Sequence, residues 1–406
     1  GDLGYKWSNK TVVDEAVNTG KTGNIIKRYK DGLDLQHNGM KFNIEMSFNK
    51  DTLKKKLQTI CADYEIKAQN ASLEATGHGF KIIKEKEGVT VDYDKTVEQL
   101  YTYVTEKWNK KANIKLTATT TVSKPKYTTE DCEKVSNEPM GSYTTEFSVG
   151  SSYANRNLNI QNGAKLINGA VVYPGEQYSC NENLYPWTED NGWHPAGTYV
   201  DGGVQDSLGG GICQVSSTLY NALLRAEIKV VKRFPHSMAV GYVPLSADAA
   251  LAGDYKDLVF ENDTDAPIYV QGIYNSGGSI TFNIYGHDTR KAGHSVKYES
   301  KTIKTTPVKT QTKKDSSKPV GYSEVESSGH VGYVAELWKI TYENGKQVSK
   351  ELIHTSTYAM SPTIVVKGTK KASTTTKKDD SDKDGKKSNE ETTKKSTSSK
   401  KSKKSE

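Results

Sequence analysis

The sequence is poor in features that mark membrane and metal proteins. It contains no run of 18 or more apolar residues, so no segment is predicted to span a membrane. It has 4 cysteines and 8 histidines among 406 residues, and no pair of cysteines has the spacing of zinc ligands. Phenylalanine is scarce, with 7 residues against 24 tyrosines, which indicates half-buried aromatic faces in contact with water. We therefore predict no metal ion and no cofactor.

The net charge of +7 does not indicate a nucleic-acid-binding protein. Thirteen lysines and seven acidic residues lie between Lys370 and Glu406, so the rest of the chain is nearly neutral. Residues 370–406 consist mainly of Lys, Ser, Thr and Asp without an aromatic residue, which predicts a disordered tail. The tail could attract anionic wall polymers or lipid headgroups, but its intermixed acids dilute the positive field and favour a solvated spacer.

The start of the chain carries no recognisable export signal. Gly1, Asp2 and Leu3 lead directly into polar sequence. We expect that an export signal or membrane anchor was removed from a protein of the cell exterior. The length is sufficient for two or three domains, and a hydrophobic content of 34% can support ordinary cores.

The strongest chemical signal is a cysteine at a predicted helix start. Three consecutive glycines precede Cys213, and Val215, Leu219 and Leu223 then recur at helical spacing. Free amide N–H groups and the helix dipole favour a thiolate in the first turn, where cysteine pKa values fall to roughly 3.5–7.5. His236 follows later in the chain and could act as the base of a thiol hydrolase.

Other roles for Cys213 stay open at this point. It could be a small buried hydrophobe, or it could form a disulfide with Cys180. His194 is a rival base. Asp201, Asp206 and Glu176 are candidates to orient His236 or to bind an amine of a ligand. Gln214 and the amides of the glycine turn are candidate oxyanion donors. The residues predicted to surround Cys213 and His236 as a binding site are Gly209, Gly210, Gly211, Gln214, Ser216, Asp201 and Glu176.

Several segments resemble the signature of the VanW family, which is named after an accessory gene of vancomycin-resistance clusters. They are Tyr173–Ser179, Gly209–Thr218, Pro235–Ser237, Tyr242–Pro244 and Asp257–Thr264. The resemblance covers residues 139–290 and implies a surface-associated protein, mostly of Gram-positive bacteria, but no particular reaction. Cys180 stands where the family pattern has an aromatic residue, which strengthens the disulfide alternative. Hairpin and helix patterns predict an α+β domain here, including strands at 268–273 and 279–285 around a turn.

The region before this domain has the pattern of a β/α module. Two amphipathic helices are predicted near residues 53–64 and 97–108, the first capped by Asn49 or Asp51 and the second opened by Asp94. Strands at 80–83 and 89–93, joined through Glu87 and Gly88, lie between them, and residues 113–121 add another extended segment. Residues 38–125 are similar to a domain family named for peptidoglycan binding. Residues 1–37 stay unassigned, and 126–138 form a linker.

The region after the central domain alternates apolar and polar residues. The sequence of residues 296–369 resembles the G-five domain, an extended all-β module of bacterial surface proteins. Segments that carry this resemblance include Gly329–Gly332, Tyr342–Lys346 and Val365–Thr369. The resemblance implies adhesion and affinity for glycans that contain N-acetylglucosamine, and a rigid stalk is the alternative.

Together these features favour a cell-surface protein that associates with peptidoglycan or cell-wall glycans. The alternative is a cysteine-dependent peptidoglycan amidase, peptidase or transpeptidase that uses Cys213 and His236. Binding is favoured because the sequence reveals no third member of a catalytic triad and because Cys180 offers a disulfide partner. The sequence indicates neither the oligomeric state nor a role in vancomycin resistance.

Overall fold

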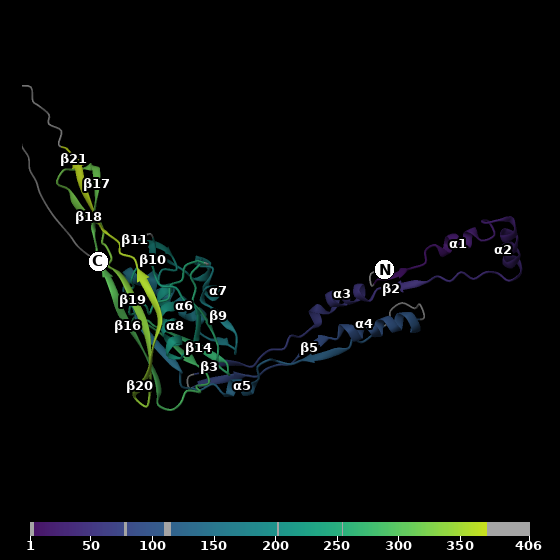
Figure 1. Ribbon diagram of the computed structural model, residues 1–406, viewed down its shortest axis with the longest axis horizontal. Coiled ribbons are helices and arrows are strands. Elements are labelled where there is room, and N and C mark those ends of the chain that lie inside the picture. Colours follow the sequence, from purple (N-terminus) through teal and green to yellow (C-terminus); the bar gives the residue numbers. More distant parts are fainter. Residues whose placement is uncertain (1–3, 77–78, 109–114, 201–202, 254, 372–406) are drawn as a thin grey trace, which may run out of the picture. The chain divides into compact units, whose positions relative to one another are not determined.

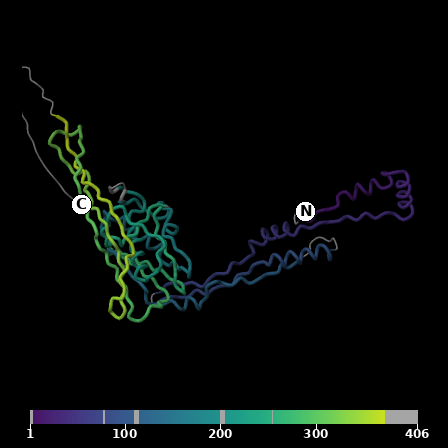
Figure 2. Tube along the Cα trace, viewed as in Figure 1, coloured from purple at the N-terminus to yellow at the C-terminus, as the bar shows by residue number. Residues whose placement is uncertain are grey.

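The computed structural model describes residues 4–76, 79–108, 115–200, 203–253 and 255–371. Its fold is mixed α+β and multidomain (Figures 1 and 2). The backbone forms two compact units, of which the first combines residues 1–309 with 329–362 and the second combines 310–328 with residues from 363 onward. In the described part, no helix is both long and apolar enough for a membrane span.

The N-terminal region consists of short helices and two-stranded sheets. Its elements are β1 (Tyr5–Trp7), α1 (Val12–Asn18), α2 (Ile25–His37), β2 (Met46–Phe48), α3 (Lys50–Cys61), β3 (Ser72–Thr76), β4 (Gly79–Ile83), β5 (Gly88–Val91), α4 (Tyr93–Thr102) and β6 (Thr120–Ser123). The antiparallel pairs are β1 with β2, β3 with β4, and β5 with β6. The fourth and fifth strands follow one another in the chain with Glu87 in the connection, as expected, but they do not pair with each other.

The two predicted helices of this region exist, with one change of cap. Asn49 accepts a hydrogen bond from the Thr52 amide and caps α3, as one of the two expected alternatives. Asp92, not Asp94, caps α4 by accepting from the Lys95 amide. Helix α4 begins at Tyr93, so Asp94 lies inside it, whereas a capping residue stands immediately before the first helical residue.

The central region contains the largest core. Its elements are α5 (Thr129–Glu133), β7 (Gly141–Glu146), α6 (Ala154–Ile167), β8 (Ala170–Val172), β9 (Gln177–Ser179), α7 (Cys180–Leu184), β10 (Pro195–Val200), β11 (Gly203–Leu208), α8 (Ile212–Arg225), β12 (Lys229–Lys232), β13 (Val259–Glu261), β14 (Ile268–Asn275) and β15 (Ser279–Tyr285). Antiparallel strands form a four-stranded sheet in the order β7-β15-β14-β8 and a three-stranded sheet in the order β12-β13-β9. The predicted β14–β15 hairpin is confirmed.

Helix α8 is the centre of this core. Val215, Leu219 and Leu223 are completely buried, as the spacing predicted, and they join Ile280 and Phe282 of β15 in one hydrophobic cluster. Full burial of such a side chain contributes about 1.5–3 kcal/mol. The helix that begins with Cys213 in its first turn is therefore held rigidly on the sheet.

The C-terminal region is all β. Its strands are β16 (His294–Thr306), β17 (Thr310–Pro319), β18 (Ser323–Ser327), β19 (Gly332–Glu343), β20 (Lys346–Tyr358) and β21 (Thr363–Lys370). In the first unit, β16, β19 and β20 form an antiparallel sheet. In the second unit, β21 pairs in parallel with β17 and antiparallel with β18. Of the tail that was predicted to be disordered, only Lys370, the last residue of β21, and Lys371 are described. Residues 372–406 lie outside the described residues.

We expect Gly141→Ala to destabilise the protein, by about 1–3 kcal/mol, as overpacking does. A Cβ at this position would lie 2.2 Å from the backbone nitrogen of Ala226, where the end of α8 meets β7. Thermal unfolding measures the effect. Gly241→Ala is the control, because nothing lies within 4 Å of its Cβ position. Equal stability of the two variants would contradict the tight approach of α8 to the sheet.

Candidate functional site

The glycine turn places Cys213 in the first turn of α8. Gly211, the residue before the helix, has φ of +108°, a left-handed conformation that side chains rarely adopt. A Cβ on Gly210 would lie 2.5 Å from the carbonyl oxygen of Ala196, so the turn must pass close to β10. The Cys213 side chain is half-buried. The turn thus fixes a thiol at the positive end of a helix dipole.

The segment after β12 brings a histidine to this thiol. The side chain of His236 interacts with the thiol of Cys213, and this interaction lowers the pKa of the thiol. The Cys213 sulfur also lies 3.4 Å from the backbone nitrogen of Leu251 and 3.5 Å from its carbonyl oxygen. Of the two histidines that the sequence offered as a base, His236 is the one in contact with the thiol.

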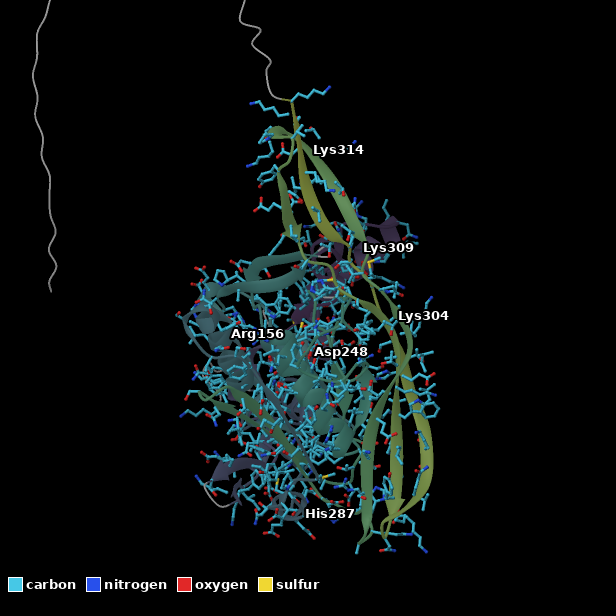
Figure 3. All side chains as sticks on the ribbon, turned by 90° about the vertical axis from the view of Figure 1, so that its left-hand side faces the viewer. Arg156, Asp248, His287, Lys304, Lys309 and Lys314 are labelled. Carbon is cyan, nitrogen blue, oxygen red and sulfur yellow. The ribbon has the colours of Figure 1, made fainter. Side chains whose placement is uncertain are left out.

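A buried carboxylate completes the constellation. Asp248 accepts a hydrogen bond from the ring nitrogen Nδ1 of His236 at 2.6 Å and from its backbone N–H at 2.7 Å. The side chain of Asp248 is 1% exposed and is labelled in Figure 3. With Nδ1 bound to a carboxylate, the other ring nitrogen is oriented for proton exchange with the thiol. Cys213, His236 and Asp248 therefore have the connectivity of a thiol triad.

The electrostatics of the three groups support an ion pair. Burial opposes the thiolate, but the hydrogen bond and charge of His236 outweigh it and lower the pKa of Cys213. Burial likewise opposes the imidazolium, but hydrogen bonds with Asp248 and Cys213 raise the pKa of His236 to about 9. Burial alone would raise the pKa of Asp248. The interactions with His236 and Arg233 outweigh burial, so this pKa lies well below its usual range. Together these shifts favour the ionised forms of the three groups, a thiolate–imidazolium pair beside a carboxylate.

A polar row on α8 holds the segment that carries Asp248. The Ser217 hydroxyl accepts a hydrogen bond from the Ala249 amide at 2.9 Å, and the Asn221 side chain donates to the Ala247 carbonyl at 2.7 Å. Cys213, Ser217 and Asn221 lie four residues apart and therefore share one face of the helix. The same face presents the thiol and fixes the backbone on both sides of the carboxylate.

Comparisons with known proteins agree with this division of the chain. Residues 155–285 match the family described as "VanW like protein", residues 1–113 match "Putative peptidoglycan binding domain", and residues 297–370 match "G5 domain". The VanW-like region therefore lies between a region that matches the "Putative peptidoglycan binding domain" family and a region that matches the G5 family. The triad residues Cys213, His236 and Asp248 all lie within the match to the VanW family.

Two curated proteins are similar to parts of the chain. The "uncharacterized protein YoaR" of Bacillus subtilis is 37% identical over 164 residues, which are 40% of this chain and 53% of that protein. The "vancomycin B-type resistance protein VanW" of Enterococcus faecalis is 28% identical over 116 residues, which are 27% of this chain and 42% of that protein. The chain thus spans about half the length of these relatives. Among solved structures, the G5 domain of an IgA1 protease is 31% identical, with a TM-score of 0.16, over 20% of this chain and 96% of that one.

The other predicted residues of the VanW-like domain have mostly structural contacts. The side-chain amide of Gln214 donates to Thr145 and to the Glu146 carbonyl, and its oxygen accepts from Arg156 at 2.6 Å. It is therefore not available as an oxyanion donor. Ser216 donates to the carbonyl of Ala249 at 2.6 Å and so helps to hold the Asp248 segment.

Asp248, and neither Glu176 nor Asp206, is the acid that binds His236 in the described structure. Glu176 accepts from the Tyr173 amide within its own turn, and Asp206 is exposed on β11. Asp201 lies outside the described residues. Asp248 was missed, although one signal was present: it is a single acid within the apolar run Ala247–Leu251, and a carboxylate in such a run requires partners.

The disulfide alternative is not realised. All four cysteines of the chain are described, and all are free thiols. Cys180 is fully buried at the start of α7. His194, the rival base, uses its backbone N–H and carbonyl to bind the side chain of Asn159.

The amide N–H of Cys213 is a candidate oxyanion donor. The turn amides of Gly209 and Gly210 donate to His194 and Ser207 at 3.3 and 3.4 Å. Among the described residues, the Cys213 amide has no such acceptor, as is usual in the first turn of a helix. An oxygen that develops negative charge beside the thiol would meet this donor and the helix dipole.

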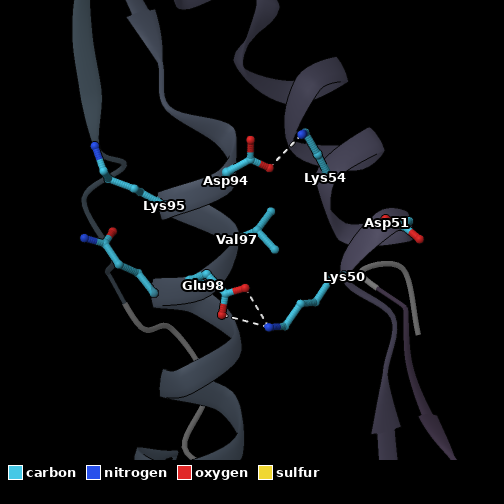
Figure 4. Close-up of a pocket in the computed structure, with 8 residues that line it drawn as sticks. Lys50, Asp51, Lys54, Asp94, Lys95, Val97 and Glu98 are labelled. Atoms are coloured by element: carbon cyan, nitrogen blue, oxygen red, sulfur yellow. Dashed lines mark hydrogen bonds and ion pairs between the residues drawn. The ribbon is translucent and has the colours of Figure 1, made fainter.

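Two hollows lie elsewhere. One, of about 640 Å³, separates α3 from α4 in the N-terminal region, and the ion pairs Lys54–Asp94 and Lys50–Glu98 flank Val97 within it (Figure 4). Its lining charges largely neutralise one another. The other, of about 540 Å³, is lined by residues of α6 together with His194 and Tyr274. In the described chain, no group of three or more His, Cys, Asp or Glu could hold a metal ion.

We expect Cys213 to react with iodoacetamide at a lower pH than the other cysteines. Its pKa is lowered, whereas burial raises the pKa of Cys132 to about 11 and that of Cys180 well above its ordinary value. The ion pair persists as long as His236 is protonated, so it is lost as the pH rises through about 9. The measurement is the alkylation rate of each cysteine by mass spectrometry, from about pH 5 to about pH 9.

His236→Ala tests the cause of this reactivity. It should move the reaction of Cys213 to a higher pH, by about one unit or more, because the thiolate loses its counter-charge. His194→Ala is the matched control and should leave the profile unchanged. A wild-type Cys213 that reacts no faster than Cys61 at neutral pH would contradict the ion pair.

Proposed function

We propose that the VanW-like domain is a cysteine-dependent enzyme that cleaves or exchanges peptide or amide bonds of peptidoglycan. The observation that carries this proposal is the connected set Cys213, His236 and Asp248, with the thiol on a helix N-terminus. The residue order Cys, His, Asp and the orienting role of the acid match those of known thiol hydrolases. The fold alone would not support an activity.

The substrate class follows from the domains that accompany this site. A VanW-like domain together with peptidoglycan-binding and G5 domains indicates a protein associated with the cell wall. We propose an extracellular location at the surface of a Gram-positive bacterium, as the resemblance to the VanW family implies. We further propose domain limits of 38–125, 139–290 and 296–369, with the flanking domains holding peptidoglycan and glycans that contain N-acetylglucosamine.

The two reasons for favouring a pure binding protein lose their force. The sequence revealed no third member of a triad, but Asp248 contacts His236. Cys180 was a possible disulfide partner of Cys213, but both are free. Binding through the flanking domains remains compatible with catalysis, because it would concentrate the enzyme on its substrate.

The proposed reaction uses groups of the VanW-like domain alone. The Cys213 thiolate attacks the carbonyl carbon of a stem-peptide bond, and the resulting oxyanion accepts a hydrogen bond from the Cys213 amide N–H. The carbon–nitrogen bond then breaks, the nitrogen takes a proton from the His236 imidazolium, and a thioester forms on the sulfur. Water or a second amine attacks the thioester carbon and gives a proton to His236, and the carbon–sulfur bond then breaks, which restores the thiolate and the imidazolium. Attack by water makes the protein a hydrolase, and attack by an amine makes it a transpeptidase.

We expect purified muropeptides to form an acyl adduct on wild-type protein, detectable by intact-protein mass after an acid quench. Cys213→Ala should abolish both the adduct and the cleaved products, because no thiolate remains. Cys61→Ala is the control, since this half-buried thiol of the N-terminal region lies outside the proposed site. Binding to sacculi without adduct or product, in wild type and Cys213→Ala alike, would identify a binding protein instead.

A further inference from the structure

The carboxylate of Asp248 is bound from two domains. One oxygen binds His236, as described above. The other accepts hydrogen bonds from the guanidinium of Arg233, at 2.8 Å, and from the hydroxyl of Tyr358. Tyr358 is the last residue of β20 and lies within the match to the G5 domain. The G5 sheet therefore contacts the triad acid directly.

Two further side chains of β20 belong to this contact. His354, Ser356 and Tyr358 alternate along the strand and so face the same side of the sheet. Ser356 accepts from Arg233 at 2.8 Å, and its hydroxyl lies 2.8 Å from that of Ser246. Opposite them on β19, the buried Ala335 and Leu337 close this face.

Tyr358 also fixes the backbone that leads to Asp248. Its hydroxyl accepts the amide N–H of Ser246 at 2.7 Å while it donates to the carboxylate. Ser246 is fully buried with φ of +69°, a conformation that costs a non-glycine residue energy and persists only when its surroundings enforce it. A single hydroxyl thus holds both the acid and a strained residue two positions before it.

No solvent is available to replace these contacts. Tyr358 is 2% exposed, Ser356 and Asp248 1%, and Ser246 0%. A buried carboxylate that loses a hydrogen-bond donor keeps its desolvation cost, and it moves to recover a partner. For Asp248, such a movement changes its geometry toward His236.

The charges around the carboxylate come from all sides of the site. His236 and Arg233 are cationic partners, and burial followed by the charge of Arg233 lowers the pKa of His354 to about 4, which keeps that ring neutral. Neutral His354 binds the Tyr220 hydroxyl at 2.7 Å. The Tyr242 hydroxyl lies 3.4 Å from His236 on the thiol side. The positive charge of Arg156 acts on Tyr242 and opposes the rise that burial causes in the pKa of its hydroxyl.

We propose that Tyr358 is a positioning residue for the cysteine site, so that the sheet formed by β16, β19 and β20 completes the site of the VanW-like domain. Tyr358 acts through Asp248 on His236 and does not touch the thiol. The catalytic consequence of this inference rests on the proposed function. Its structural part, the geometry of the ion pair, can be measured without any substrate.

The experiment compares Tyr358→Phe with Tyr298→Phe in the full chain. Tyr298 of β16 also donates one hydrogen bond to the VanW-like domain, to the Leu224 carbonyl at 2.7 Å, but it does not contact Asp248. Both variants remove one hydroxyl from the same sheet. The readouts are the pH profile of Cys213 alkylation by iodoacetamide and, with muropeptides, kcat/KM. Circular dichroism verifies folding, and Asp248→Asn gives the effect of losing the carboxylate.

Tyr358→Phe should move the alkylation profile toward that of Asp248→Asn, to higher pH, and lower kcat/KM about tenfold, the scale of a hydrogen bond to a charged group. Tyr298→Phe should behave as wild type in both. A Tyr358→Phe profile that coincides with wild type, or that moves to lower pH, overturns the proposal. Ser356→Ala decides the matter if Tyr358→Phe does not fold: a smaller shift to higher pH is expected, and no shift overturns it.

The two proposals fail in different ways. If wild type produces no adduct or product from muropeptides but Tyr358→Phe still shifts the alkylation profile, the enzyme proposal fails and the positioning role holds. If wild type is active and Tyr358→Phe is as reactive and active as wild type, the enzyme proposal holds and the positioning role fails.

Discussion

The buried charge of Asp248 is the constraint on which the candidate site depends. A carboxylate that is 1% exposed is stable only with several hydrogen-bond donors, and His236, Arg233 and Tyr358 supply them. These donors come from segments far apart in the chain. The hydrogen bonds to this one carboxylate therefore join the segment after β12, which carries Arg233 and His236, to the segment around Asp248 and to strand β20. The geometry of the thiol and imidazole follows from this arrangement.

Helix α8 contributes to the site in two ways. Its N-terminal turn favours the Cys213 thiolate electrostatically, and its side chains at four-residue intervals bind the backbone around Asp248. The buried face opposite packs on the four-stranded sheet, so neither function requires the helix to move. The thiol of Cys213 and the imidazole of His236 are thus held together by elements that also form the hydrophobic core.

Local patterns in the sequence were sufficient for some of these elements. Helical spacing predicted α8 with Cys213 in its first turn, and turn chemistry predicted the β14–β15 hairpin, because both depend on neighbours in the chain. The same reasoning failed for Gln214, whose side-chain partners Thr145 and Arg156 lie more than fifty residues away. Contacts across such separations are decided by tertiary packing, which periodicity does not contain.

The missed acid shows what a different reading of the sequence could have recovered. Nearness to the glycine motif and polarity favoured Asp201, Asp206 and Glu176, but polar surroundings are where a carboxylate needs no specific partner. Asp248 lies within an apolar run, where an ionised group is unfavourable unless donors converge on it. Alternation on β20 likewise places polar His354, Ser356 and Tyr358 on the inner face of a sheet, where apolar residues are the rule. Each is a polar group among packed side chains, and each indicates a partner that the sequence does not name.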